Sequence, residues 1–164
     1  EDGRRESTPV MQYVGACYCA PTHPLAHHLQ LDLDDLADQV LLVRESGSGL
    51  TDGVERLFRG AGLQLRPAME IAENEARKRA AIEGLGVAVL STHAVRSELA
   101  VGLLVPLHVK GFPLHLMWHA VWLTGHDPAP STRAFKEFLC TGAWRQAALE
   151  AQARVLSLEA AIGR

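Results

Sequence analysis

The residues Ser46-Gly47-Ser48-Gly49 are the first candidate for chemistry in this sequence. They follow an apolar run of strand length and precede a stretch of helical period, so they form the turn into a helix start. The first N–H groups of a helix point outward with positive partial charge, and glycine lets a ligand approach the backbone closely. Such a helix start binds carboxylate or phosphate, with the two serine hydroxyls as further donors and Arg44 as a cation if it faces the same side. The residues alone also fit a second interpretation, in which Ser48 caps the helix and the glycines form a tight turn.

Cysteine, histidine and serine residues also occur close together, but their spacing indicates neither a metal site nor a catalytic one. Cys17 and Cys19 share one face of an expected strand, where they could form a metal pair or act as small buried apolar residues; we adopt the second interpretation. No two histidines lie on a convincing helix face beside a carboxylate, as a zinc site would require. The sequence has no nucleophile elbow and no Walker-type loop, and its Gly-Ser-Gly turn lacks the dinucleotide-binding pattern. We therefore expect no enzyme activity, no metal and no cofactor.

The composition is that of an ordinary soluble domain. Of the 164 residues 48% are hydrophobic and 21% are charged, and no apolar run approaches the roughly 18 residues that a membrane-spanning helix needs. The net charge of −3 argues against a DNA-binding surface, which would normally be basic. Three cysteines without disulfide spacing fit a reducing cytoplasm. The first residues show neither an initiator Met nor an apolar signal segment, so we interpret the chain as part of a longer cytoplasmic protein.

Strands and helices alternate along the chain, as in an α/β protein. Apolar, β-prone runs predict strands over residues 13–20, 40–43, 69–71, 87–90, 103–109 and 114–123. Apolar residues at helical spacing predict helices over residues 33–37 and 50–61, the second ended by Gly62. Asn74 is the expected N-cap of a helix that runs to Gly84, and Ser131 is that of a helix ended by Gly142.

A last helix is predicted over residues 143–162. Apolar residues recur in it at steps of four and three, which forms a narrow stripe suited to another helix: Trp144, Ala148, Ala151, Val155, Leu158 and Ile162. An isolated helix of this length is marginal in water, so the stripe must be buried. It packs either against the rest of the chain or against a second copy of it.

Several short segments, in a fixed order over about residues 10 to 140, resemble the effector domains of LysR-type transcription regulators. They are residues 20–26 (Ala-Pro-Thr-His-Pro-Leu-Ala), 33–36, 41–43, 44–49 (Arg-Glu-Ser-Gly-Ser-Gly), 74–76, 83–91 and 102–107. The segment 44–49, together with residues 109–114, is most similar to the branch that regulates carbon-fixation (RuBisCO) operons.

The resemblance implies a periplasmic-binding-protein-like (type 2), Rossmann-like α/β fold with two lobes joined by crossover strands. Residues 1–21 would be a lobe I remnant with the first crossover, and residues 22–116 a complete, effector-binding lobe II. Residues 117–142 would form the second crossover and return to lobe I, followed by the amphipathic helix at 143–164. By the same resemblance, we expect the DNA-binding head and the start of lobe I to lie outside this sequence.

The resemblance also implies a function and a site. A small-molecule effector, a carboxylate or phosphorylated metabolite, would bind between the lobes at Arg44, Ser46, Gly47, Ser48, Gly49, Thr51, Asn74 and Glu75. The helix start at 74–76 could equally be a cap and nothing more, and Arg77 beside it is either solvated or a contact specific to this sequence. The branch usually continues the glycine loop with Thr-Arg, where this sequence has Leu50-Thr51. The cation is lost and the hydroxyl displaced by one residue, which weakens the case for a phosphorylated sugar or another multiply charged effector.

The expected role is a ligand-sensing module that controls transcription. It would contact DNA only through the missing head, form a homo-oligomer and bind no membrane. Two alternatives remain open at this point: a solute-binding protein of the same fold, and an interaction fragment that senses nothing.

Overall fold

The computed structural model describes residues 5–65, 67–125, 129–142 and 144. The chain divides into two compact units. The central unit is Gln12–Leu116, and the terminal unit consists of residues 1–11 and 117–164. Two long paired strands, β1 (Arg5–Cys19) and β6 (Leu114–Leu123), contribute residues to both units.

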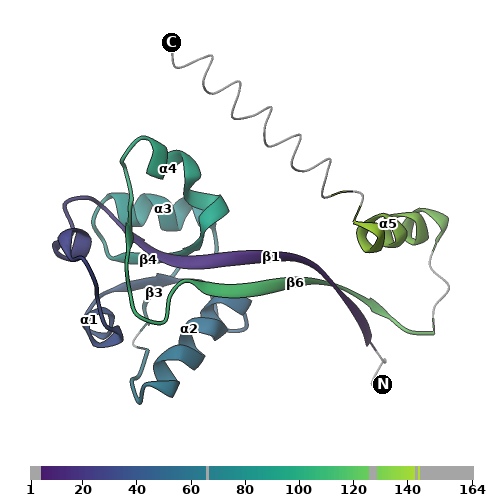
Figure 1. Ribbon diagram of the computed structural model, residues 1–164, viewed down its shortest axis with the longest axis horizontal. Coiled ribbons are helices and arrows are strands. Elements are labelled where there is room, and N and C mark those ends of the chain that lie inside the picture. The colour runs from purple at the N-terminus through teal and green to yellow at the C-terminus, as the bar shows by residue number, and fades with distance from the viewer. Residues whose placement is uncertain (1–4, 66, 126–128, 143, 145–164) are drawn as a thin grey trace, which may run out of the picture. The chain divides into compact units, whose positions relative to one another are not determined.

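The central unit is built on a mixed sheet with the strand order β3-β2-β4-β1-β5 (Figure 1). Strand β2 (Leu41–Val43) runs parallel to β3 (Pro67–Glu70) and to β4 (Val87–Ser91). Strand β1 is antiparallel to β4 and to β5 (Val105–Leu107). Residues 41–43 of β2 and 87–90 of β4 are all apolar and buried, as expected of parallel strands covered by helices on both faces.

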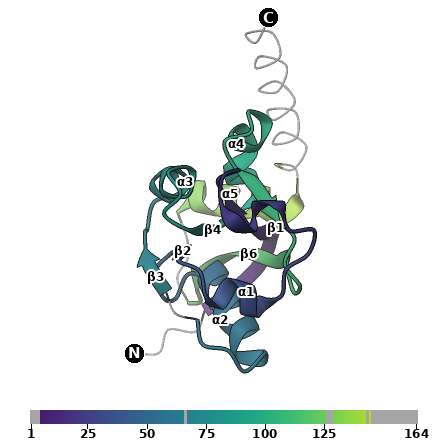
Figure 2. The same cartoon turned by 90° about the vertical axis from the view of Figure 1, so that its left-hand side faces the viewer.

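Helices cover both faces of this sheet. On one face lie α2 (Gly49–Gly60) and the short α1 (Leu33–Ala37), and on the other lie α3 (Asn74–Ile82) and α4 (Arg96–Ala100), as Figures 1 and 2 show. The 3-10 helix η1 (Pro24–His27) packs its Leu25 into the cluster on the α2 side. A second 3-10 helix, η2 (Thr92–Val95), leads from β4 into α4. The ends of β2 and β3 thus lead into the starts of α2 and α3.

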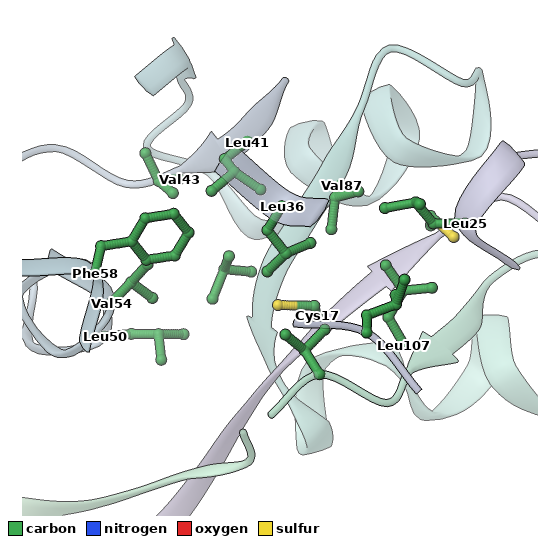
Figure 3. Packing of buried hydrophobic residues seen from close by; sticks show 14 residues of the cluster. Cys17, Leu25, Leu36, Leu41, Val43, Leu50, Val54, Phe58, Val87 and Leu107 are labelled. Carbon is green, nitrogen blue, oxygen red and sulfur yellow. The ribbon is translucent and has the colours of Figure 1, made fainter. Parts of the chain in front are cut away.

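Alternation of side chains along the strands separates two cores. Leu41 faces a cluster with Cys17, Val54 and Phe58 beneath α2, which Figure 3 shows, whereas its neighbour Leu42 faces the α3 side. The α3-side cluster consists of Tyr18, Leu42, Ala80, Ala81, Ala88, Leu90, Val95 and Leu104. Helix α2 buries Leu50, Val54 and Phe58, four residues apart, so its apolar stripe matches the sheet face.

Most predicted elements are confirmed, with changes at their ends. The helix at 33–37 agrees in both bounds, and the strand at 114–123 does as well. The first strand begins at Arg5 instead of Tyr13, because pairing with β6 extends it beyond the buried region. The strand predicted at 103–109 is shorter, and the segments η1, η2 and α4 were not predicted. They are four or five residues long, too short for a periodic pattern.

Two predicted caps are wrong. The N-cap of α3 is Glu73, so Asn74 is its first helical residue, and the N-cap of α5 (Pro130–Thr141) is Ala129, which places Ser131 inside the first turn. Proline at the start of α5 favours the earlier beginning, because its missing N–H is not needed there. Gly142 ends α5 in the left-handed conformation, as predicted.

The terminal unit contains α5 and residues 117–123 of β6. Within it, Lys136 Nζ lies 3.8 Å from the centroid of the Trp122 ring, and the Trp122 indole N–H donates to Glu6 Oε2 at 2.8 Å. Of the predicted C-terminal helix only Trp144 falls among the described residues. The apolar stripe beyond it lies outside them.

Candidate effector site

The start of α2 is held by its own loop. Gly47 adopts a positive φ of 89°, which favours glycine, and its N–H donates to Asp52 Oδ1 at 3.0 Å. Ser48 occupies the N-cap position, but its side chain makes no capping hydrogen bond. In the described part of the chain, the N–H groups of Gly49 and Leu50 have no partner, as expected for the first residues of a helix. The loop therefore presents helix-start donors that the Ser48 hydroxyl does not occupy.

Tyr13 of β1 lies against this helix start, which the sequence did not indicate. A Cβ atom on Gly49 would lie 3.4 Å from the Tyr13 hydroxyl, and one on Gly15 would collide with the Leu50 side chain. Burial raises the pKa of Tyr13, and the nearby charge of Arg44 opposes this rise. The strand that crosses between the units thus lines the glycine loop. The only signal in the sequence was an aromatic residue at the expected start of a strand.

The remaining side chains of the loop are partly engaged. Thr51 is 4% exposed, and its hydroxyl donates to the carbonyl of Arg44 at 3.3 Å. Ser46 Oγ lies 3.3 Å from Glu55 Oε1. Both residues line a cavity of about 460 Å³ on this side of α2, together with Val43, Glu55, Arg59, Leu63, Gln64, Leu65 and Glu70. Thr51 therefore holds the turn after β2, whereas the exposed Ser46 faces the solvent.

The start of α3 contains a buried cation. Arg77 is 2% exposed, so of the two interpretations the solvated one is wrong. One terminal guanidinium nitrogen donates to the carbonyl of Val89 in β4 at 3.2 Å, and the other donates to Asn74 Oδ1. Its Nε is buried and has no hydrogen-bond partner among the described residues. Glu75, also predicted as a contact, is exposed and pairs with Lys78 at 2.8 Å.

Charge links the two helix starts. Burial lowers the pKa of Arg77; the like charge of Arg44 lowers it further, and Glu45 opposes the shift. The pKa of Glu45 is itself lowered, first by its own backbone N–H, then by the hydrogen bond from Arg44, and in part by the charge of Arg77. The Arg44–Glu45 ion pair spans 2.5 Å. Two arginines from different elements therefore act on one carboxylate, and the fold gathers positive charge where β2 ends and α3 begins.

The predicted contacts do not all meet at one point. Asn74 accepts a hydrogen bond from Arg77, and the charge of Arg44 lowers the pKa of Arg77, whereas Ser46 and Thr51 line the cavity beside α2. In the part of the chain that the structure describes, no group of three or more metal-ligating side chains occurs. Within the same residues, no helix is long and apolar enough to span a bilayer.

Comparison with known proteins gives this arrangement its context. The chain is 39% identical over 125 residues to a RuBisCO operon transcriptional regulator of Allochromatium vinosum, which covers 76% of this chain and 41% of the relative. It is 41% identical over 117 residues to a regulator of the same description from Acidithiobacillus ferrooxidans, covering 71% and 38%. The chain thus spans about two fifths of the length of these curated relatives.

Solved structures support the same relationship. The regulatory domain of Synechocystis PCC6803 CcmR, determined in complex with 2-PG, aligns with a TM-score of 0.72 and 30% identity over 85% of this chain and 67% of that one. The fold is therefore the periplasmic-binding-protein-like α/β fold that the sequence predicted. Residues 1–143 match the LysR substrate binding domain, and the chain belongs to that family.

Proposed function

We propose that this chain is the effector-sensing domain of a LysR-type transcription regulator. In this proposal the central unit corresponds to lobe II, and it binds a small anionic metabolite where the starts of α2 and α3 approach the Arg44–Glu45 pair. The observation that carries the proposal is the helix start at Gly49 and Leu50. Its N–H groups lack partners among the described residues and lie beside a loop that bears Arg44.

Physical chemistry favours an anion there. Backbone N–H groups at a helix start and an arginine side chain are all donors, so they match a ligand that only accepts hydrogen bonds. Arg44 is about half-exposed and can exchange its Glu45 partner for a ligand carboxylate or phosphate. The 2-PG complex of the CcmR regulatory domain supports a small anionic effector.

The regulatory role rests on the relatives. Both curated relatives are described as transcriptional regulators, which favours a cytoplasmic, non-enzymatic sensor over a solute-binding protein. In the whole regulator, the effector would act through its different affinity for two arrangements of the domain. DNA would be contacted by a separate segment, in a homo-oligomer.

A chemical-shift titration tests this proposal. We expect 2-PG, inorganic phosphate or acetate to move the backbone amide signals of residues 47–50 in the 164-residue chain. Arg44→Gln should weaken binding about tenfold, the loss of one charge-assisted hydrogen bond. Arg79→Gln removes the same charge from an exposed position on α3 and should change affinity less than twofold. Saturating anions that leave residues 47–50 unmoved while shifting other amides would show that the loop is only a helix cap.

A further inference from the structure

We propose that Arg77 is a positioning residue that turns the Asn74 side chain into a donor for a second anionic group of the effector. The inference rests on the proposed function, since it concerns the same ligand. It assigns the effector to the class of small dianions, such as dicarboxylates or phosphorylated carboxylates, with one anionic group at each helix start.

The orientation of Asn74 follows from donor and acceptor chemistry. A guanidinium carries only donors, so the Asn74 amide must present its oxygen to Arg77, as it does. The amide NH₂ group, with two donors, then points away from the guanidinium. Asn74 itself is exposed at the first position of α3. Arg77 thus selects one of the two amide orientations and leaves the donor end available to a ligand.

Burial makes this arrangement rigid. Arg77 is almost wholly enclosed and is also tied to the Val89 carbonyl of β4, so its guanidinium cannot swing out to solvent as a surface arginine would. Its Nε is buried without a partner among the described residues, which is unusual for a group that normally finds an acceptor. Because Arg77 is a buried cation with incomplete hydrogen bonding, it attracts the acceptor oxygen of Asn74 more strongly than an exposed arginine would.

The charges around Arg77 point to the same class of ligand. Arg44 adds a second positive charge, and Glu45 is the carboxylate that acts on both arginines. Glu75, a carboxylate in the first turn of α3, is paired with Lys78. The start of α3 has no side-chain cap, so its first N–H groups add to the donors of Asn74. Donors at two helix starts, together with the positive charges of two arginines, suit a ligand with two anionic groups.

This changes the expectation drawn from the sequence. The loss of the usual cation after the glycine loop weakened the case for a multiply charged effector. Arg77, in helix α3, supplies a positive charge in place of that cation. Its side chain is buried, and the charge of Arg44 acts on it.

The test compares ligands of different charge on four variants. Succinate and 2-PG serve as the probes with more than one anionic group, and acetate as the single carboxylate. In Arg77→Met we expect the affinity for succinate or 2-PG to fall about tenfold and that for acetate to stay within twofold. Asn74→Ala should produce the same loss, and the double variant no more than either single one, because both act on one contact. Arg79→Met removes a charge from the exposed face of the same helix and should leave all three affinities within twofold.

A spectroscopic signal separates positioning from general stability. The side-chain NH₂ resonances of Asn74 should move on addition of succinate or 2-PG in the wild type and remain still in Arg77→Met. Because Asn74 is exposed, Asn74→Ala keeps the test valid even if Arg77→Met fails to fold. Equal losses for acetate and the dianions, or additive effects in the double variant, would overturn the proposal.

The titration also separates this inference from the proposed function. Shifts at residues 47–50 without any change at Asn74 would overturn the inference and leave the proposed function standing. A ligand that moves neither helix start would count against both.

Discussion

Lys78 of helix α3 forms a largely buried ion pair with Glu98 of helix α4. Its ammonium lies 2.9 Å from Glu98 Oε1 and 2.8 Å from Glu75 Oε1. The side chains of Lys78 and Glu98 are 8% and 14% exposed, whereas that of Glu75 is 84% exposed. The two carboxylates therefore bind the same cation in very different surroundings, which permits a matched comparison.

Glu98→Gln removes the charge of the enclosed partner and keeps its shape and one acceptor oxygen. Removing one partner of a buried pair costs about 3–5 kcal/mol, and removing one from an exposed pair costs about 0.2–1 kcal/mol. Because Lys78 keeps Glu75, we expect an intermediate loss of about 2 kcal/mol in the free energy of unfolding. Glu75→Gln, the exposed control, should cost less than about 0.5 kcal/mol.

Urea denaturation followed by circular dichroism measures both values. The double variant Lys78→Met/Glu98→Gln should recover part of the loss, because an apolar side chain replaces the buried cation that has lost its enclosed partner. Burial by itself would raise the pKa of Glu98, but several smaller effects together outweigh it: the hydrogen bond from Lys78, the backbone N–H of Glu98 itself, the charge of Lys78 and the hydrogen bond from Ser97. The pKa of Glu98 therefore lies below its usual 4.5. The stabilisation is therefore present above pH 4.5 and is lost as the pH falls through the lowered value. Equal costs for Glu98→Gln and Glu75→Gln at pH 7 would refute this reasoning.

Three further outcomes are expected. In the native chain only the exposed Cys140 should react quickly with a thiol reagent, because burial raises the pKa of the other two thiols. All three thiols should react in urea, and rapid labelling of more than one thiol in the native chain would contradict this. Burial lowers the pKa of His23, so the free energy of unfolding should fall as the pH drops below about 6.5 and level off below the folded-state pKa. His23→Asn keeps an N-cap acceptor and should remove this pH dependence in urea titrations from pH 5 to 8. Glu45→Gln leaves Arg44 without its carboxylate partner and should raise the affinity for 2-PG about threefold at low salt, as measured by calorimetric titration. An unchanged affinity would show that Glu45 does not compete with the ligand for Arg44.

The sequence alone was sufficient for most of the elements and for the family. Helical spacing of apolar residues located α2, and continuous apolar runs located the strands β2 and β4, because these patterns are visible within a short stretch of chain. The glycine loop was recognisable for the same reason: a turn between a strand and a helix is a local feature, and its chemistry depends on residues that are adjacent in the chain. The short segments that resemble LysR-type domains are local as well.

What only the tertiary structure decided is how side chains from different elements meet. Thr51 belongs to the loop in sequence, yet it is buried and donates to the Arg44 carbonyl. Tyr13 lies in a strand far along the chain from Gly49, but the pairing of β1 with the sheet brings its hydroxyl against that glycine. Arg77 lies in the first turn of a helix and is of a residue type that is usually solvated, yet it is buried and donates to the Val89 carbonyl of β4 and to Asn74. Burial and charge at these positions are sums over neighbours from several strands and helices, and periodicity along one element carries no information about such sums.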